Sequence, residues 1–101
     1  MDYSARPIDG GLEIKLSGRM TLVDHDRFRS VVDTLEGMEG GRCVFDLSGL
    51  EFVDSSGLGM FLIARDVAQN RGIDIVLRGA RDGVQRILGI AKFDTLFTVE
   101  A

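Results

Sequence analysis

Residues 42–72 read RCVFDLSGLEFVDSSGLGMFLIARDVAQNRG, and the rest of the chain can be placed around them. The apolar run Cys43-Val44-Phe45 lies between glycines and is typical of a strand that is buried on both faces. Further along, Asp54-Ser55-Ser56 precedes a second apolar run at residues 60–64. Small acidic and hydroxylated residues before such a run predict the start of a helix. The segment therefore predicts a central strand followed by a helix.

The start of this helix is a candidate binding site. Asp54 or Ser55 is the predicted N-cap. Ser56, Gly57 and Gly59 carry little or no side chain, so the first turn is thinly covered. Its backbone N–H groups would be open to a docking partner or to a phosphate.

One face of the predicted helix extends this site. At about 100° per residue, Leu58 and Leu62 fall on the side from which Ser55 projects. These three residues are expected to form an exposed line, although a capping serine and two exposed leucines also occur for purely structural reasons. Phe61 is expected at the margin of the opposite, buried stripe, whose other members are Met60, Ile63, Ala64, Val67 and Ala68.

The remaining segments alternate between strand and helix patterns. A strand is expected over residues 12–16, ending at Gly18, because apolar and charged residues alternate there. The spacing of apolar residues from Asp24 predicts an amphipathic helix that ends at Gly37. Residues 73–77 are expected to form another strand, and Asp82 to cap a short helix before a last strand. This order predicts an α/β domain with parallel strand pairing.

Length and charge limit the classes of function. The 101 residues, 45% of them apolar, suit one compact domain over residues 1–101. Sixteen acids against twelve bases give a net charge of −4, which argues against a nucleic-acid-binding surface. No charged-then-apolar leader precedes the first strand and no apolar run is long enough to cross a bilayer, so a soluble, cytoplasmic protein is expected, with a protein as partner. The single Cys43 is expected to be a core side chain.

Catalysis is not expected. Neither Ser55 nor Ser56 has the Gly-x-Ser-x-Gly spacing of a hydrolase elbow, and His25 is most simply a solvated residue of the helix that starts near Asp24. One His and one Cys give no dense ligand set for zinc, the carboxylates lack EF-hand spacing, and the chain has no Walker-type motif. We therefore predict that the protein is not an enzyme and binds neither a metal ion nor a cofactor.

The stretch Phe45 to Gly59, with Asp54-Ser55-Ser56-Gly57-Leu58-Gly59 at its end, resembles the signature of STAS domains, specifically of bacterial anti-sigma factor antagonists. The likeness continues, more loosely, into the C-terminal part. It implies a mixed sheet of four to five strands with helices packed against it. In that family the serine after the aspartate is phosphorylated by a kinase that is also the anti-sigma factor, which makes Ser55 the expected phosphoacceptor and a phosphatase a second partner. The expected partner-binding residues are Asp54, Ser56, Gly57, Leu58 and Leu62.

The sequence departs from the family pattern at one place. The family usually follows its strand-ending glycine with Glu-Leu-Asp, whereas Gly18 is followed here by Arg19-Met20-Thr21. A second function therefore stays open: a non-phosphorylated STAS adaptor, such as a subunit of a phospholipid transporter or of a stress-signalling assembly, in which the same face is a fixed interface.

Overall fold

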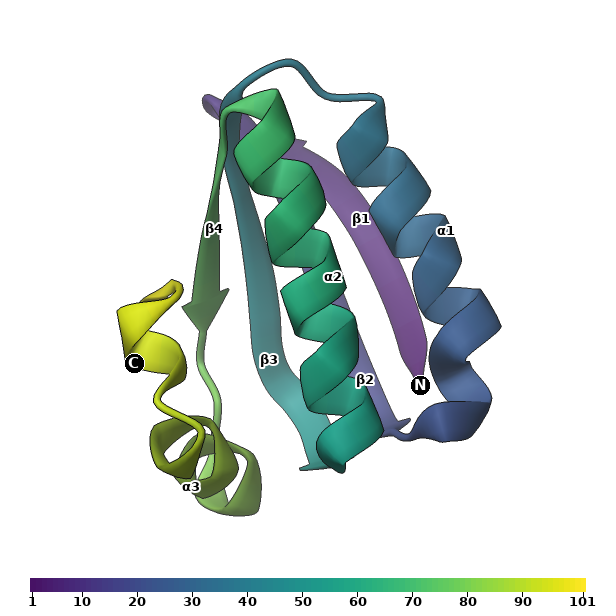
Figure 1. Cartoon of the computed structure of the whole chain (residues 1–101), viewed down its shortest axis with the longest axis vertical. Coiled ribbons are helices and arrows are strands. Elements are labelled where there is room, and N and C mark those ends of the chain that lie inside the picture. Colours follow the sequence, from purple (N-terminus) through teal and green to yellow (C-terminus); the bar gives the residue numbers. More distant parts are fainter.

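Strand β3 (Gly41–Val53) lies in the middle of a five-stranded sheet in the computed structural model, which describes residues 1–101 (Figure 1). The strand order is β1-β2-β3-β4-β5; β1 pairs antiparallel with β2, and every other pairing is parallel. The other strands are β1 (Asp2–Ile8), β2 (Gly11–Met20), β4 (Ile73–Arg78) and β5 (Thr98–Glu100). The predicted α/β class, with parallel pairing around a central strand, is confirmed.

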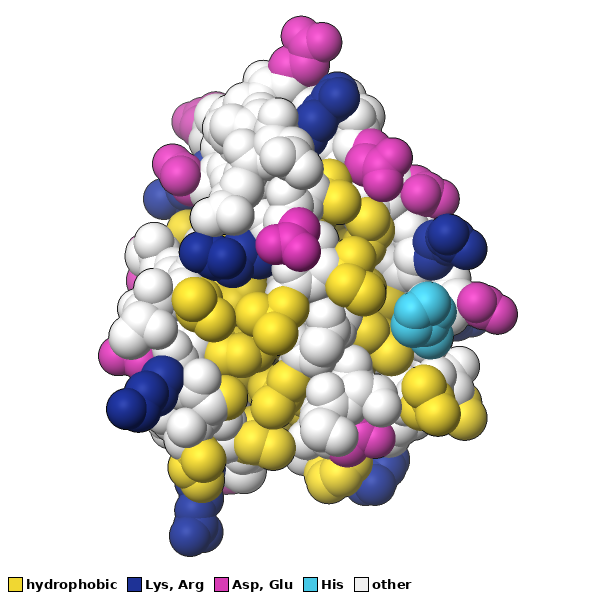
Figure 2. Space-filling model, in the orientation of Figure 1, with side chains coloured by type: hydrophobic (Ala, Val, Ile, Leu, Met, Phe, Trp, Pro, Cys, Tyr) yellow, Lys and Arg dark blue, Asp and Glu magenta, His cyan; other side chains and the backbone are white.

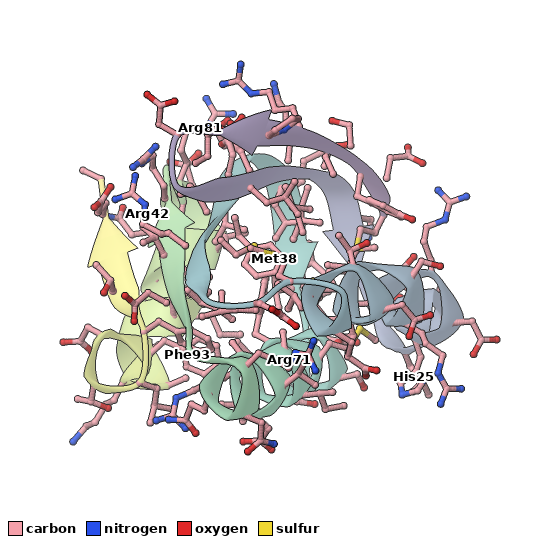
Figure 3. All side chains as sticks on the ribbon, turned by 90° about the horizontal axis from the view of Figure 1, so that it is seen from above. His25, Met38, Arg42, Arg71, Arg81 and Phe93 are labelled. Atoms are coloured by element: carbon pink, nitrogen blue, oxygen red, sulfur yellow. The ribbon has the colours of Figure 1, made fainter.

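Two helices lie side by side on one face of the sheet: α1 (His25–Glu36) and α2 (Ser55–Arg71) (Figure 1). The shorter α3 (Asp82–Ile90) lies near the end of the sheet at which β3 finishes. Short 3₁₀ turns, η1 (Leu22–Asp24) and η2 (Phe93–Thr95), precede α1 and follow α3. Figure 3, which looks from the end at which α2 finishes and β3 begins, shows both long helices on the same side of the sheet.

The core between the helices and the sheet contains a chain of phenylalanine rings. Phe61 of α2 is fully buried, and its ring centroid lies 5.9 Å from that of Phe28 in α1 and 5.8 Å from that of Phe45 in β3. Phe93 continues the chain at 6.4 Å from Phe61, and Phe97 lies 5.1 Å from Phe93. Edge-to-face pairs at such distances add to the stability that burial alone supplies. Phe61 thereby connects both layers with the C-terminal segment.

The sheet differs from the prediction in the length of its strands. β2 continues past Gly18 to Met20, and the residues after Gly49 belong to β3 and do not form a separate segment. Two register shifts between β2 and β3 allow this, because a bulge lets the strands stay paired while the chain bends. The ends of β2 and β3 consequently lie beside each other, directly before α1 and α2.

The start of α3 also differs from the prediction. Arg81 occupies the N-cap position, and Asp82 is the first helical residue, with φ +49°. Asp82 therefore does not cap the helix as expected. Aspartate is one of the few residues that adopt this left-handed conformation without a large penalty.

The face of the sheet that the helices leave open carries a row of alternating charges. Lys15, Asp46, Arg78 and Glu100 stand opposite one another on β2 to β5, and Arg78 Nη2 lies 2.8 Å from Glu100 Oε1. Burial alone would raise the pKa of Asp46. The hydrogen bond that its Oδ1 accepts from the Ser48 N–H, at 2.9 Å, together with the charges of Lys15 and Arg78, outweighs burial and lowers that pKa. The two positive and two negative charges of this row balance each other.

Candidate functional site

The loop between β3 and α2 is held by Asp54. Its backbone N–H donates to the carbonyl oxygen of Met20 at the end of β2, at 3.2 Å, which joins the two strand ends. Its carboxylate Oδ1 accepts a hydrogen bond from the Gly57 N–H at 2.9 Å. Of the two predicted N-caps, the structure selects Asp54, which satisfies one of the free donors of the first turn.

Ser55 is the first residue of α2 and is exposed. Its hydroxyl makes no hydrogen bond within the chain, in contrast to the carboxylate of Asp54. Ser56, the next residue, is half-buried. A serine with a free hydroxyl on a backbone fixed by its neighbour is accessible to an enzyme that transfers a group to it, and of the two serines Ser55 is the more accessible.

Gly57, in the first turn of α2, is buried against the end of β2. A Cβ at this position would lie 2.7 Å from Val53 Cγ1 and 2.8 Å from the carbonyl oxygen of Met20. These are distances that real Cβ atoms do not reach, so only glycine lets the helix start this close to the strands. Gly59 differs, because a Cβ there would meet nothing within 4 Å. Packing therefore explains why position 57 is a glycine, but it gives no reason for a glycine at position 59.

The buried stripe of α2 is rotated from the predicted one: Met60, Ala64 and Ala68 are buried as predicted, and Val67 is partly buried against the core. Ile63, expected in the core, is 46% exposed, and Phe61, expected at the margin, is completely buried. The centre of the stripe is rotated by about 50° from its predicted direction. The residues that the helix buries are Gly57, Met60, Phe61, Ala64 and Ala68.

This rotation leaves the predicted outer line only partly exposed. Leu62 is 38% exposed and lies on the same side as Ser55, as expected. Leu58 is half-buried and packs against the core from the flank of the helix. The first two turns of the outer face therefore consist of Ser55, Gly59 and Leu62, with Leu58 and Ile63 at the two borders, and the exposed Asp66 follows one turn later.

Figure 2 shows hydrophobic side chains gathered in two bands, one on each side of α2. The groove toward α1 is lined by Met60, Ile63 and Val67 together with charged residues of α1. The groove toward β5 is crossed by Arg65, whose Nε donates to the carbonyl oxygen of Leu96 at 2.9 Å. Neither groove contains Ser55, so the candidate phosphoacceptor lies on open surface.

Comparison with known proteins decides the family. The family model described as "Mlab, STAS domain" matches residues 7–99 of the chain. The chain belongs to the STAS domain family. The family resemblance carried by the motif Asp54 to Gly59 is thereby confirmed.

Relatives and solved structures extend this result. A STAS-domain containing protein of Pseudomonas aeruginosa strain UCBPP-PA14 is 34% identical over 101 residues, covering 98% of this chain and 99% of its own. An anti-sigma factor antagonist from Mycobacterium paratuberculosis superimposes with a TM-score of 0.81 at 20% identity, over 98% of this chain and 84% of that one. A sulfate transporter family protein from Wolinella succinogenes gives a TM-score of 0.72 at 18% identity, over 87% and 74% of the two chains. At these identities the two structures show the fold alone.

The other reactive side chains of this STAS domain lie away from Ser55. Cys43 is buried in β3, as predicted, and burial raises the pKa of its thiol to about 12. His25 is exposed at the start of α1, as predicted, with Nδ1 3.9 Å from Asp26 Oδ1. No group of three or more His, Cys, Asp or Glu side chains is placed to hold a metal ion. None of the helices combines the length and apolar character needed to cross a membrane.

Sequence reasoning missed one feature of the site. The guanidinium of Arg19, at the end of β2, lies over the ring of Phe52 in β3, with Cζ 4.2 Å from the ring centroid. The two residues are register partners only because a bulge precedes Arg19. The signal available in the sequence was an aromatic residue, Phe52, three residues before Ser55, but nothing in the sequence pairs it with Arg19.

Proposed function

We propose that this STAS domain is an anti-sigma factor antagonist that is switched by phosphorylation of Ser55. When Ser55 is unphosphorylated, the start of α2 docks on a kinase-type anti-sigma factor, which then releases its sigma factor. When Ser55 is phosphorylated, the domain dissociates from the anti-sigma factor. A phosphatase resets the switch, and the proposed setting is the bacterial cytoplasm. The observation that carries the proposal is the exposed, unbonded hydroxyl of Ser55 beside the capping carboxylate of Asp54.

The docking surface proposed for the kinase surrounds this hydroxyl. Leu62 supplies exposed apolar area on the same side of the helix, and Leu58 and Ser56 border it. Asp54 contributes through the loop that it holds, and Gly57 through the close packing that keeps the helix start against β2. The proposed surface is therefore small and rigid, which limits the entropy lost on binding.

Phosphorylation is expected to change binding far more than folding. A phosphate adds about −1.5 to −2 charges, and at a helix N-terminus the dipole favours negative charge by roughly 0.3–1 kcal/mol. Ser55 is exposed, so the phosphate has room in the free protein. Burying it in an interface without a cationic partner would cost on the order of 2–5 kcal/mol, which is roughly 30-fold to several-thousand-fold in affinity. Release is therefore favoured over unfolding.

Phosphorylation by a purified kinase tests the proposal. The probe is a purified serine-kinase-type anti-sigma factor from the same organism, incubated with ATP and the wild-type protein, Ser55→Ala or Ser56→Ala. We expect one added phosphate, seen by mass spectrometry, in the wild type and in Ser56→Ala and none in Ser55→Ala. Modification that persists in Ser55→Ala and disappears in Ser56→Ala would assign the site to Ser56 and contradict the proposal.

Asp54→Asn separates two roles of the carboxylate in the same assay. Asparagine caps helices about as well as aspartate, so the hydrogen bond to the Gly57 N–H is retained and melting should change little. If phosphorylation falls sharply while the melting temperature is unchanged, Asp54 contacts the kinase in addition to capping the helix. If phosphorylation is also unchanged, its role is confined to the cap.

A second candidate function is a fixed adaptor in a transporter complex, such as one for phospholipids. The description of the matching family model as "Mlab, STAS domain" favours it. Under this alternative the same face of α2 is permanently covered. Transporter genes beside the gene for this chain, together with an absence of phosphate in cells, would support the adaptor over the switch.

A further inference from the structure

Arg19 is held at a defined position by an aromatic ring. Its Cζ lies 4.2 Å from the centroid of Phe52, and the two residues are register partners at the ends of β2 and β3. Arg19 is exposed, and Phe52 is 38% exposed. Stacking on an aromatic face restricts a guanidinium without using its N–H groups, all of which stay available for hydrogen bonds in the plane.

The charge of Arg19 is unpaired within the chain. No carboxylate oxygen lies within the 4.0 Å that defines an ion pair, and its guanidinium donates no hydrogen bond. Arg6, Arg27 and Arg78, by contrast, each lie 2.8 Å from a carboxylate oxygen of the same chain. Nine of the twelve Lys and Arg side chains, Arg42 among them, form no ion pair, so what distinguishes Arg19 is the aromatic ring that orders it.

The backbone that carries this cation lies close to the start of α2, whereas the Arg19 side chain, next to the buried Met20 that faces α2, lies on the other face of the sheet at the same end of the molecule. The residue after Arg19 is Met20, whose carbonyl oxygen accepts the hydrogen bond from the Asp54 N–H. Phe52 lies three residues before Ser55. The next residues along the chain after β2 add exposed apolar area, because Leu22 is 68% and Val23 89% exposed. Figure 2 shows hydrophobic, basic and acidic side chains adjoining one another at the end of the molecule where α2 starts.

We propose that Arg19, positioned by Phe52, extends the docking surface of α2 and binds a carboxylate of the partner protein. The partner is the one proposed above, so the identity of the probe rests on the proposed function. An exposed, preorganised guanidinium fits a carboxylate through two parallel hydrogen bonds. Arginine and aromatic residues are also the types that dominate interface energetics. The structure thus assigns an acidic side chain to the partner at the position facing the ends of β2 and β3.

The affinity of the purified kinase for variants of the unphosphorylated protein tests the contact. Arg19→Gln should weaken binding roughly tenfold, and Arg19→Glu by about 30-fold or more, because it places two carboxylates together. Arg19→Lys keeps the positive charge but loses the planar guanidinium that can form two parallel hydrogen bonds. Its affinity should therefore lie between those of the wild type and Arg19→Gln. Phe52→Leu keeps apolar area but removes the ring, and it should also weaken binding.

Arg42→Glu is the matched control. Arg42 is exposed and unpaired at the opposite end of β3 (Figure 3), about 30 Å from Phe52 at the rise of a strand. Its affinity should stay within about twofold of the wild type, since charges separated by several Debye lengths are screened. Equal affinities for Arg19→Glu and the wild type would overturn the proposal, as would equal losses for Arg19→Glu and Arg42→Glu.

The salt dependence of binding gives a second readout. The wild-type affinity should fall as ionic strength rises, and Arg19→Gln should show a shallower fall, because one charge pair is missing. Equal slopes would overturn the carboxylate contact. If Arg19 served only to hold a phosphate on Ser55, then Arg19→Gln would leave the affinity of the unphosphorylated protein unchanged, which also contradicts the proposal.

Failure of the contact and failure of the switch are distinguishable. If phosphorylated and unphosphorylated proteins bind the kinase equally, while Arg19→Glu binds weakly, the switch is wrong and the contact stands. If phosphorylation abolishes binding while Arg19→Glu binds as tightly as the wild type, the contact is wrong and the switch stands.

Discussion

The inner and outer faces of α2 differ in how far packing explains their residues. On the inner face, Gly57, Phe61 and Ala64 are buried against the strands and against α1, and each is explained by what it touches. On the outer face, Ser55, Gly59 and Leu62 touch little, and the fold gives no reason for a free hydroxyl, an unhindered glycine or an exposed leucine there. The difference teaches that residues without a structural explanation are those to assign to a partner.

Replacing Phe61 should produce the largest effect on the inner face. Phe61→Ala removes the ring that contacts Phe28, Phe45 and Phe93, and should destabilise the fold by about 3–5 kcal/mol. Ile63→Ala, on the exposed border, should cost about 1 kcal/mol or less. Urea denaturation of both variants measures this. Equal losses would mean that the buried stripe is centred where periodicity alone places it.

The two glycines provide the next comparison. Gly57→Ala should destabilise by about 1–3 kcal/mol, because the new methyl group overlaps Val53 and the carbonyl oxygen of Met20. Gly59→Ala meets no atom and should stabilise the helix by about 0.5–1 kcal/mol. Thermal denaturation should show a lower melting temperature for Gly57→Ala and a higher one for Gly59→Ala than for the wild type. If both variants melt at the same temperature, the close approach of α2 to β2 is wrong.

The sequence predicts the inner framework well and the outer details less well. Apolar runs and alternation place the central strand and both long helices, and small polar residues locate the start of α2. The direction of the buried face of α2 is predicted only roughly, because residues 58–64 are apolar all round the helix apart from Gly59 and periodicity has little contrast there. The stacking of Arg19 on Phe52 depends on a bulge, and strand register cannot be read from the spacing of residues within one strand.

The open face of the sheet should show a smaller, pH-dependent effect. The pKa of Asp46 is lowered in the folded protein, so its contribution to stability is present above the unfolded pKa and is lost as pH falls through the folded one. Asp46→Asn should therefore cost about 1 kcal/mol at pH 7, and the difference from the wild type should shrink below about pH 4. Denaturation across pH 3–7 measures it. A difference that grows toward low pH would contradict the assigned charge row.

The smallest effect on stability is expected at Leu62. Leu62→Ala should cost well under the roughly 2–5 kcal/mol of a buried leucine, since the side chain is 38% exposed. Affinity for the kinase should nevertheless weaken by about 1 kcal/mol or more. Chemical denaturation and binding measured on the same variant separate the two. A variant that unfolds easily yet binds normally would move Leu62 to the structural face.

The central claim is that the outer face of α2 is a docking surface controlled by the charge at Ser55. The most direct measurement is the affinity of the purified kinase for the unphosphorylated protein and for the protein phosphorylated on Ser55, with melting temperatures of both forms recorded alongside. We predict that phosphorylation weakens binding at least about 30-fold and leaves the melting temperature nearly unchanged. Equal affinities of the two forms, or an unfolded phosphorylated form, would contradict this account.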